Sequence, residues 1–356
     1  RSITKMTAAG VFMFSSVFLL FLANGISSHD PPAAIYKINL DLEPEKRWLE
    51  VVKDYSQIVK DINKVFLTYV PEILMPLLQK LASQIDQYFP TEYAREIRGI
   101  ASALKTDVGT IVLGNIVYDL TAHCTSIVAQ DSNGTIWHAR NMDYAFTNML
   151  RNLTVFLHFQ KNNKTVFSST SFVGSIGVLT GQRHGAFSIS VDERGEKDAF
   201  WHLFYNALVA LLDKKASIMT FAVRNALENR TTFASAVEYL QKTDTMAPVY
   251  YIMAGVGPQE GAVITRDRLK AVDTWYLNKT EHRWYLVETN YDHWLPTPKS
   301  DQRRQAAVKM MDTLGQQGVQ SSGLFKILHT QPIFRDITIY TSIMCPRDNT
   351  YQNWVW

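Results

Sequence analysis

Cysteine is scarce in this sequence, and its scarcity limits what can hold the fold together. The 356 residues include only two cysteines, Cys124 and Cys345. They allow at most one disulfide bond within the chain, so a disulfide-rich scaffold is excluded. Two interpretations stay open at this point: a Cys124–Cys345 disulfide, or a free and reactive thiol.

Several signatures of catalysis and binding are also missing. The sequence contains no His-Glu-x-x-His, no Cys-x-x-Cys and no Gly-x-Ser-x-Gly, the signatures of common zinc hydrolases, dithiol sites and serine-hydrolase elbows. Its nine histidines show no metal-ligand spacing, so we expect no metal and no cofactor. The net charge of +3 comes without a dense lysine and arginine tract, so nucleic acid is not an expected partner.

Long hydrophobic runs are absent apart from residues 11–23, which are too few to cross a bilayer comfortably. Lys5 precedes this run and small residues follow it near Gly25, the pattern of a secretory signal. We therefore expect a signal peptide at residues 1–28 and a soluble mature protein in a secretory compartment. Five Asn-x-Ser/Thr tripeptides agree with this route as candidate glycosylation sites: Asn133, Asn152, Asn163, Asn229 and Asn278.

The composition, 46% hydrophobic and 19% charged, is that of an ordinary globular chain. Residues 44–89 show helical periodicity that Pro71 and Pro76 must interrupt. From Cys124 onward the pattern changes to short strands and helices. The expected strands are 125–130, 135–139, 155–160, 165–171, 186–192, 249–256, 262–266, 271–276, 284–289 and 337–343, and the expected helical stretches are 198–241 and 301–314. Such blocks predict an α+β fold of two sheets covered by helices.

The hairpin after Cys124 carries the most suggestive chemistry. Its two strands join across residues 131–134, Asp-Ser-Asn-Gly, a strong turn signal. This pairing would place Arg140 and Asp143 side by side with the thiol. A permanent cation at Arg140 would lower the thiol pKa, and Asp143 would orient an amine or guanidinium. An ordinary ion pair between Arg140 and Asp143 at the strand end is the alternative interpretation.

Four segments together resemble a known family. They are residues 124–131 (Cys-Thr-Ser-Ile-Val-Ala-Gln-Asp), 140–144 (Arg-Asn-Met-Asp-Tyr), 192–194 (Asp-Glu-Arg) and 289–294 (Thr-Asn-Tyr-Asp-His-Trp). Over nearly the whole chain, the sequence resembles the acid amidases that hydrolyse N-acylethanolamines and their relatives the acid ceramidases. These belong to the cholylglycine hydrolase group of N-terminal nucleophile hydrolases.

The resemblance implies a fold and a maturation step. The catalytic β subunit, residues 124–356, would be a four-layer αββα sandwich, and residues 29–123 would form an additional helical α subunit. A precursor of this kind cuts itself on the amino side of its nucleophile, here between His123 and Cys124. The Cys124 α-amine is created by that cut.

The resemblance also assigns roles to individual residues. Cys124 would be the nucleophile that forms a thioester, and its freed amine would move protons to the leaving group. The remaining roles are positioning by Arg140 and Asp143, an oxyanion donor at Asn290, a further active-site arginine at Arg303, and an acid sensor at Glu193. A solvated turn residue is the alternative interpretation for Glu193.

The implied substrate is a lipid amide, an N-acylethanolamine such as palmitoylethanolamide, cleaved at acid pH in the lysosome. Ceramide is the alternative substrate. Acid ceramidases carry additional cysteines that link their two chains, and this sequence has none to spare, which favours N-acylethanolamines and chains paired without a covalent bond. A non-catalytic secreted lipid-binding glycoprotein with a Cys124–Cys345 disulfide is the alternative from a different class.

A lipid substrate gives the hydrophobic stripes of the helical stretches a possible task. Their side chains would form a surface that touches a membrane peripherally and an acyl channel. Packing in the core is the alternative interpretation. The candidate lipid contacts are Leu74, Leu77, Leu78 and Leu81 of the α subunit, and Trp201, Phe204, Tyr205, Leu208 and Leu211 of the β subunit.

Overall fold

The computed structural model describes residues 33–59, 75–120, 123–144, 146–194 and 216–356. All of them fall within one compact unit, Pro32–Trp356. The expected signal peptide, residues 1–28, lies outside the described residues.

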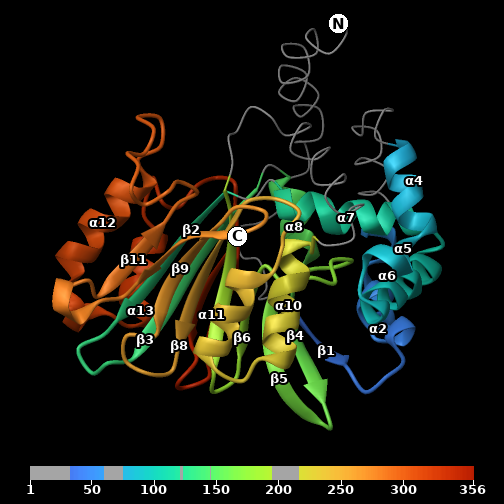
Figure 1. Cartoon of the computed structure of the whole chain (residues 1–356), viewed down its shortest axis with the longest axis horizontal. Coiled ribbons are helices and arrows are strands. Elements are labelled where there is room, and N and C mark those ends of the chain that lie inside the picture. Colours follow the sequence, from blue (N-terminus) through green and yellow to red (C-terminus); the bar gives the residue numbers. More distant parts are fainter. Residues whose placement is uncertain (1–32, 60–74, 121–122, 145, 195–215) are drawn as a thin grey trace, which may run out of the picture. The chain divides into compact units, whose positions relative to one another are not determined.

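Two β-sheets form the centre of this unit (Figure 1). The larger sheet has eight strands, in the order β1 (Ala34–Asn39), β4 (Thr154–Lys161), β5 (Lys164–Phe172), β6 (Thr180–Arg183), β7 (Phe187–Glu193), β8 (Val249–Gly255), β9 (Gly261–Arg266) and β10 (Ala271–Tyr276). The smaller sheet has five, in the order β11 (Tyr285–Glu288), β2 (His123–Gln130), β3 (Ile136–Asp143), β12 (Thr338–Cys345) and β13 (Thr350–Val355).

Helices cover the outer face of each sheet. Helices α10 (Met219–Asn229) and α11 (Phe233–Lys242) pack on the eight-stranded sheet, and α12 (Arg303–Leu314) and α13 (Ser321–Leu328) pack on the five-stranded sheet. The inner faces of the two sheets meet in a shared core, where Val128 and Leu286 pack with Tyr250 and Val263. The expected α+β fold, a four-layer αββα sandwich, is confirmed.

The remaining helices come mainly from the N-terminal part of the chain. They are the 3-10 turn η2 (Pro44–Lys46), α2 (Leu49–Asp54), α4 (Met75–Ser83), α5 (Ile85–Tyr88), α6 (Thr91–Leu104) and α7 (Val108–Leu120), while the short α8 (Thr147–Leu153) precedes β4. The long helical pattern predicted for residues 44–89 is therefore divided into short helices where it is described. Residues 60–74, which include Pro71, lie outside the described residues.

Each strand predicted from the sequence forms, with shifted ends, and so does the helix predicted for residues 301–314. Among the described elements, β1, β6, α8, α13 and β13 were not predicted, nor were the 3-10 turns η4 (Lys279–Glu281) and η5 (Gln316–Gly318). Strand β1 pairs in parallel with β4, so that Ala34 lies beside Val155. Its pairing partner is more than a hundred residues away in the sequence, and a local pattern cannot indicate such a pairing. Within residues 33–59 and 75–120 the elements are helices apart from this edge strand of the larger sheet. The division into a helical α subunit and a catalytic β subunit stays a prediction.

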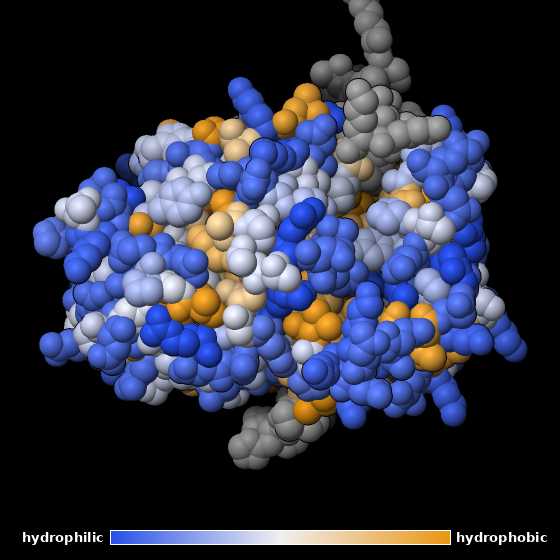
Figure 2. Space-filling model, turned by 60° about the horizontal axis from the view of Figure 1, so that its bottom comes forward, coloured by the Kyte–Doolittle hydropathy of each residue, from blue (hydrophilic) through white to orange (hydrophobic). Residues whose placement is uncertain are grey.

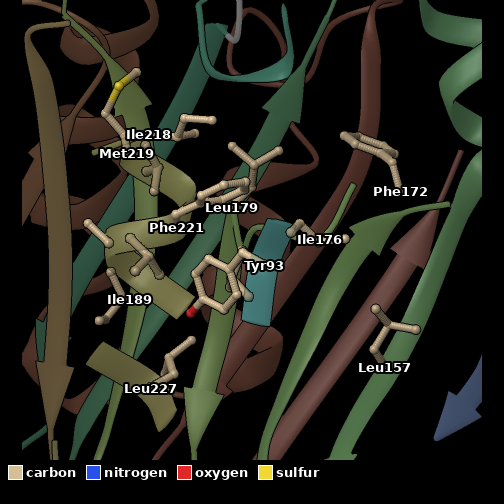
Figure 3. Packing of buried hydrophobic residues seen from close by; sticks show 14 of the residues in the cluster. Tyr93, Leu157, Phe172, Ile176, Leu179, Ile189, Ile218, Met219, Phe221 and Leu227 are labelled. Atoms are coloured by element: carbon tan, nitrogen blue, oxygen red, sulfur yellow. The ribbon is translucent and has the colours of Figure 1, made fainter. Parts of the chain in front are cut away.

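A hydrophobic core joins the N-terminal helices to the rest of the unit. Figure 3 shows Tyr93 of α6 among Phe221 and Leu227 of α10 and Ile189 of β7. The rings of Tyr93 and Phe221 meet edge to face, with their centroids 5.1 Å apart. Residues before and after the expected cleavage site are therefore packed into one core.

This core also tests part of the expected lipid-contact surface. Leu78 and Leu81 of α4 are buried, with 3% and 0% of their surface exposed. They do not form an exposed membrane surface, because their side of α4 packs into the protein. Their part in an acyl channel stays a prediction. Leu77 is half-buried against the same core. The other candidate lipid contacts, Leu74, Trp201, Phe204, Tyr205, Leu208 and Leu211, lie outside the described residues.

Candidate active site

Strand β2 alternates between two environments, as the two-residue period of a strand requires. Val128 faces the eight-stranded sheet, whereas Ile127 and Ala129 pack beneath α12 and α13. Cys124 and Ser126 share the face of Val128. The thiol of Cys124 therefore lies between the two sheets and is fully buried.

Arg140 of β3 reaches this thiol directly. Its Nη2 donates to Cys124 Sγ at 2.9 Å and to the carbonyl of Val191 at 2.8 Å. Its Nη1 donates to the carbonyl of Leu179 at 2.7 Å and to the hydroxyl of Thr180. These acceptors fix the guanidinium plane, so the expected contact between the arginine and the thiol is confirmed.

The Cys124 thiol is nevertheless protonated in the uncleaved chain. Burial raises its pKa far above the ordinary value, Arg140 lowers it, and Asp192 and Asp143 raise it. The prediction that Arg140 lowers the thiol pKa is confirmed, but in the uncleaved chain burial has the larger effect. Attack by Cys124 therefore requires its proton to leave first.

The two cysteines are both free and buried. Cys124 lies opposite Met142 on β3, while Met344, next to Cys345, lies opposite His138. Along β3 the two thiols are thus separated by about five residues, or roughly 17 Å at 3.3 Å per residue. A disulfide needs Cα atoms within about 7 Å. The interpretation as a Cys124–Cys345 disulfide is wrong.

Two side chains bind the backbone of Cys124. Asn290 Oδ1 accepts a hydrogen bond from the Cys124 nitrogen at 2.9 Å, and Arg303 Nη1 donates to the Cys124 carbonyl. Arg303 Nη2 also donates to Asn290 Oδ1 at 3.2 Å and to Asp301 Oδ2 at 2.7 Å. The nitrogen held by Asn290 belongs to the His123–Cys124 peptide bond. Three of the predicted site residues, Cys124, Asn290 and Arg303, are therefore brought together at the expected cleavage point.

Asn290 and Glu193 are linked in a way that the sequence did not predict. Asn290 Nδ2 donates to the backbone carbonyl of Glu193 at 2.9 Å. Glu193, at the end of β7, is partly exposed and reaches the site through that carbonyl. Its role as an acid sensor stays a prediction.

Asp143 lies on the other face of β3 from Arg140. The two residues are three positions apart on one strand, so the two-residue period turns their side chains in opposite directions. Arg140 contacts the thiol directly, whereas Asp143 acts on the thiol through its charge, and the two side chains form no ion pair with each other. The positioning role of Asp143 stays a prediction. Asp143 Oδ1 accepts a hydrogen bond from Thr338 at 2.7 Å, and Arg335 Nη1 lies 3.9 Å from Oδ2. Burial raises the pKa of Asp143 to about 6.

Asp192, the neighbour of Glu193, was missed as a site residue. It is fully buried, its Oδ1 accepts a hydrogen bond from Ser126 at 3.0 Å, and the same oxygen lies 3.9 Å from Arg140 Nη2. Burial raises its pKa to about 6, while the charge of Arg140 and the hydrogen bond from Ser126 lower it. The alternation of β7 was the available signal, since Ser190 and Asp192 share the face turned toward the smaller sheet.

A chain of buried polar groups leads to Asp192 between the sheets. Ser190 Oγ lies 3.2 Å from Ser126 Oγ and 2.9 Å from His138 Nε2. The other ring nitrogen of His138 lies 2.9 Å from Ser188 Oγ. Burial lowers the pKa of His138 to about 3, so the ring is neutral. The carboxylate near the thiol is thus supported by neutral hydrogen-bonding groups.

The five candidate glycosylation sites all have side chains that are at least partly exposed. Asn133, Asn152, Asn163 and Asn229 are exposed. Asn278 is partly exposed, and its Oδ1 accepts a hydrogen bond from the Thr280 nitrogen at 3.0 Å. Glycosylation at these sites stays a prediction.

Hydrophobic side chains on the face shown in Figure 2 lie in small groups among hydrophilic ones. Across the part of the chain that the structure describes, no helix is long and apolar enough to cross a membrane. Within the same residues, no cluster of three histidine, cysteine, aspartate or glutamate side chains is placed to hold a metal ion.

Two families match parts of the chain. Residues 124–328 match linear amide C–N hydrolases of the choloylglycine hydrolase family, and this match begins at Cys124. Residues 31–89 match the beta subunit of N-acylethanolamine-hydrolyzing acid amidase. That description gives the letter beta to the segment that we label α from the sequence.

Individual relatives are similar over most of their length. The chain is 40% identical to the N-acylethanolamine-hydrolyzing acid amidase of Rattus norvegicus, over 88% of this chain and 85% of the relative. It is 37% identical to the acid ceramidase of Heterocephalus glaber, over 90% and 85%. The solved structure of a Caenorhabditis elegans N-acylethanolamine-hydrolyzing acid amidase ortholog, 34% identical, aligns with a TM-score of 0.60 over 65% of this chain and 100% of the other.

Proposed function

We propose that this chain, which belongs to the choloylglycine hydrolase family of linear amide C–N hydrolases, hydrolyses N-acylethanolamines such as palmitoylethanolamide to a fatty acid and ethanolamine. Family membership makes the chain an amidohydrolase. The choice of Cys124 as the nucleophile rests on the contacts of its sulfur and its backbone nitrogen. Cys124 has its sulfur 2.9 Å from Arg140 Nη2 and its backbone nitrogen 2.9 Å from Asn290 Oδ1.

The nucleophile first has to create its own N-terminus. The Cys124 thiol loses its proton, its sulfur attacks the carbonyl carbon of His123, and the acyl group moves from nitrogen to sulfur as the C–N bond breaks. The nitrogen takes up a proton, and water then hydrolyses the thioester. Asn290 and Arg303 hold Cys124 on both sides of its Cα, so the residue keeps its position when the chain is cut.

The mature enzyme then uses the same sulfur on the substrate. The thiolate attacks the amide carbonyl, the ethanolamine nitrogen leaves with a proton from the α-ammonium group, and water hydrolyses the acyl thioester. A free α-amine has a pKa of about 7.7–8.0 and is protonated in an acid compartment, as this step requires. Buried Asp143 Oδ2, which accepts no hydrogen bond from the described residues, is a suitable acceptor for that ammonium group.

Asn290 is the proposed donor to the negative oxygen of the tetrahedral intermediate. Its Oδ1 accepts hydrogen bonds from the Cys124 nitrogen and from Arg303. Its Nδ2 carries two hydrogens and donates one to the Glu193 carbonyl, and in the proposed reaction it donates the other to the substrate oxygen. Removal of one such donor typically lowers kcat by about 100- to 1,000-fold. We expect an Asn290→Ala variant to lose activity within that range.

The setting of the reaction is also part of the proposal. The signal-like start and the five glycosylation tripeptides support passage through the secretory pathway to the lysosome. A lipid amide substrate requires peripheral contact with membranes. After cleavage the two chains remain a non-covalent pair, because both cysteines of the sequence lie in the second chain.

Mass spectrometry and N-terminal sequencing of the precursor, before and after incubation at acid pH, test the cleavage step. The expected product is a chain that begins with Cys124, and a Cys124→Ala variant is expected to stay intact. A precursor that hydrolyses palmitoylethanolamide without being cut would contradict the proposed order of events.

Hydrolysis of palmitoylethanolamide and of ceramide, measured on the same cleaved preparation, tests the substrate. We expect the larger kcat/KM for palmitoylethanolamide. The similar identities to the amidase and the ceramidase, 40% and 37%, leave this choice to the assay. A preference for ceramide would replace the proposed substrate with the alternative one.

A further inference from the structure

Glu288, the last residue of β11, has no role in the mechanism above, and its environment is costly for a carboxyl group. It is completely buried. Its Oε2 has no hydrogen-bond partner among the described residues, which also offer it no ion pair. Burying a carboxyl group without a counter-ion is unfavourable. The presence of Glu288 two residues before Asn290 therefore needs a physical explanation.

The other oxygen of Glu288 holds the turn that contains Asn290. Oε1 accepts hydrogen bonds from the backbone nitrogens of Thr289 at 2.9 Å and Tyr291 at 3.1 Å. Asn290 lies between these two donors and has a φ of 73°, in the left-handed region. That conformation is unfavourable for most residues and needs support from its surroundings.

The carbonyl groups of the same turn are held from α12. Arg303 Nη2 donates to the carbonyl of Thr289 at 3.1 Å, and Arg304 Nη2 donates to the carbonyl of Tyr291. Glu288 binds the N–H groups and the two arginines bind the C=O groups, so the backbone on both sides of Asn290 is fixed. The direction of the Asn290 side chain, with Oδ1 at the Cys124 nitrogen, follows from this backbone.

Burial, more than the neighbouring groups, favours the uncharged form of Glu288. On the neighbouring strand it lies opposite Ser126, whose hydroxyl donates to Asp192. Burial raises the pKa of Glu288 to about 8, Arg304 of α12 lowers it and Asp192 of β7 raises it. At neutral and acid pH the side chain is therefore a carboxylic acid that serves as a hydrogen-bond acceptor through Oε1.

We propose that Glu288 is a positioning residue for Asn290: its Oε1 holds the two N–H groups that flank Asn290 and thereby places the Asn290 amide at the Cys124 nitrogen. This inference rests on the proposed function, which makes that nitrogen and Asn290 part of the reaction. Glu288 acts through Asn290, so its removal should affect kcat more than KM.

Glu288→Met and Glu288→Gln separate positioning from simple packing. Methionine fills a similar volume without a good acceptor, whereas glutamine keeps a neutral oxygen at the same reach. We expect Glu288→Met to retain the melting temperature of the wild type but to lose about 100-fold in kcat on palmitoylethanolamide, as if an oxyanion donor were displaced. We expect Glu288→Gln to keep most of the wild-type kcat. Self-cleavage should be slower in Glu288→Met than in Glu288→Gln.

Glu260 offers a matched control. Its Oε2 accepts hydrogen bonds from the nitrogens of Val256 at 3.0 Å and Gly257 at 2.7 Å, in the turn between β8 and β9. These contacts are of the same type as those of Glu288. The turn lies at the far end of β2 from Cys124, where the Gln259 nitrogen donates to Gln130 Oε1. Glu260→Met should keep the wild-type kcat.

A second test uses Asn290→Ala as the background. Once the Asn290 side chain is gone, adding Glu288→Met should lower kcat little further, because both changes remove the same contribution. The inference is overturned if Glu288→Met keeps full kcat, if Glu288→Gln loses as much as Glu288→Met, or if the losses from Glu288→Met and Asn290→Ala multiply. A wild-type enzyme without activity on any lipid amide would instead overturn the proposed function.

Discussion

Arg140 is the single cation in direct contact with the thiol among the described residues. Arg140→Lys keeps the charge but loses the planar set of donors that binds Val191, Leu179 and the sulfur together. We expect kcat on palmitoylethanolamide to fall by about 100-fold or more, similar to the loss of one preorganised donor. Steady-state kinetics on the cleaved enzyme provide the measurement.

The control for this change is an arginine that holds backbone carbonyls away from the thiol. Arg183 of β6 donates to the carbonyls of Leu227 at 2.6 Å and Glu228 at 3.0 Å. Arg183→Lys should leave kcat within about twofold of the wild type, as expected of a change remote from the chemistry. Equal losses in the two variants would mean that Arg140 acts through general stability.

The β2–β3 hairpin is the element that presents the thiol and the arginine to each other, and its turn depends on Gly134. Gly134 has a φ of 82°, and an added Cβ would lie 3.3 Å from Pro258 Cγ. We expect Gly134→Ala to lower the free energy of unfolding by about 1–2 kcal/mol, the cost of a left-handed L-residue. Urea denaturation followed by tryptophan fluorescence measures this change.

A glycine in a helix should respond in the opposite direction. Gly114 lies in α7, and an added Cβ there would meet no atom within 4 Å. Gly114→Ala should raise the free energy of unfolding by about 0.5–1 kcal/mol, because alanine loses less conformational entropy in a helix. Destabilisation by both substitutions would show that the backbone conformation is not what distinguishes these sites.

At the scale of the whole molecule, Glu96 links the chains that self-cleavage would produce. It lies on α6 and is completely buried, and it binds both Arg47 and Arg224, with Arg224 Nη2 at 2.7 Å. Glu96→Ala would leave the guanidinium of Arg224 buried without this partner. We expect a loss of about 3–5 kcal/mol in the free energy of unfolding. Size-exclusion chromatography of the cleaved protein should then show separated chains.

A neighbouring glutamate on the same helix provides the comparison. Glu92 also binds Arg47, at 3.0 Å, but 61% of its side chain is exposed. Glu92→Ala should change the free energy of unfolding by less than about 1 kcal/mol, as for other exposed pairs. If the two variants behaved alike, burial would not be the reason for the strength of the Glu96 contacts.

The buried acids also determine how the stability of the uncleaved chain depends on pH. Glu288 has a pKa of about 8 in the folded chain and an ordinary value near 4.3 when unfolded, so the folded state keeps its proton to higher pH. Its contribution is fully present below the unfolded value and is lost as pH rises through the folded one. Buried His138, with a pKa of about 3, opposes this trend only below its ordinary value near 6.5.

Burial also raises the pKa of Asp143 and Asp192, to about 6, so their contributions are lost mainly below pH 6.5. Between pH 6.5 and 8 the contribution of Glu288 therefore changes most. We expect the melting temperature of a Cys124→Ala chain, which stays uncleaved, to fall as pH rises through this window. Adding Glu288→Gln should flatten the decline, because glutamine does not titrate. A decline of the same slope in both proteins would assign the pH dependence to other groups.

Much of the fold was predictable because its signals are local. Alternating hydrophobic residues and the Asp-Ser-Asn-Gly turn indicated the β2–β3 hairpin, and the structure pairs the two strands with Arg140 directed at the thiol. Strand β1 was not predictable in the same way. Its residues gain their strand conformation from β4, whose pairing residues begin at Val155.

The sequence by itself determined which residues are available for the proposed chemistry: the thiol at Cys124, an arginine on the next strand, and an asparagine far along the chain. Those assignments follow from spacing and from the resemblance of the motifs. Spacing along a strand predicts which side chains share a face, but which faces are buried against each other is decided only when the two sheets pack.

Only the tertiary structure decided that Asp192 lies beside Arg140 at the site and that Leu78 and Leu81 pack inside. It also decided that the thiol stays protonated despite its arginine, since burial between two sheets changes the pKa more than one neighbouring charge does. Burial and contacts between distant strands arise when the layers pack. They are therefore properties of the assembled sandwich, which a local pattern of residues cannot contain.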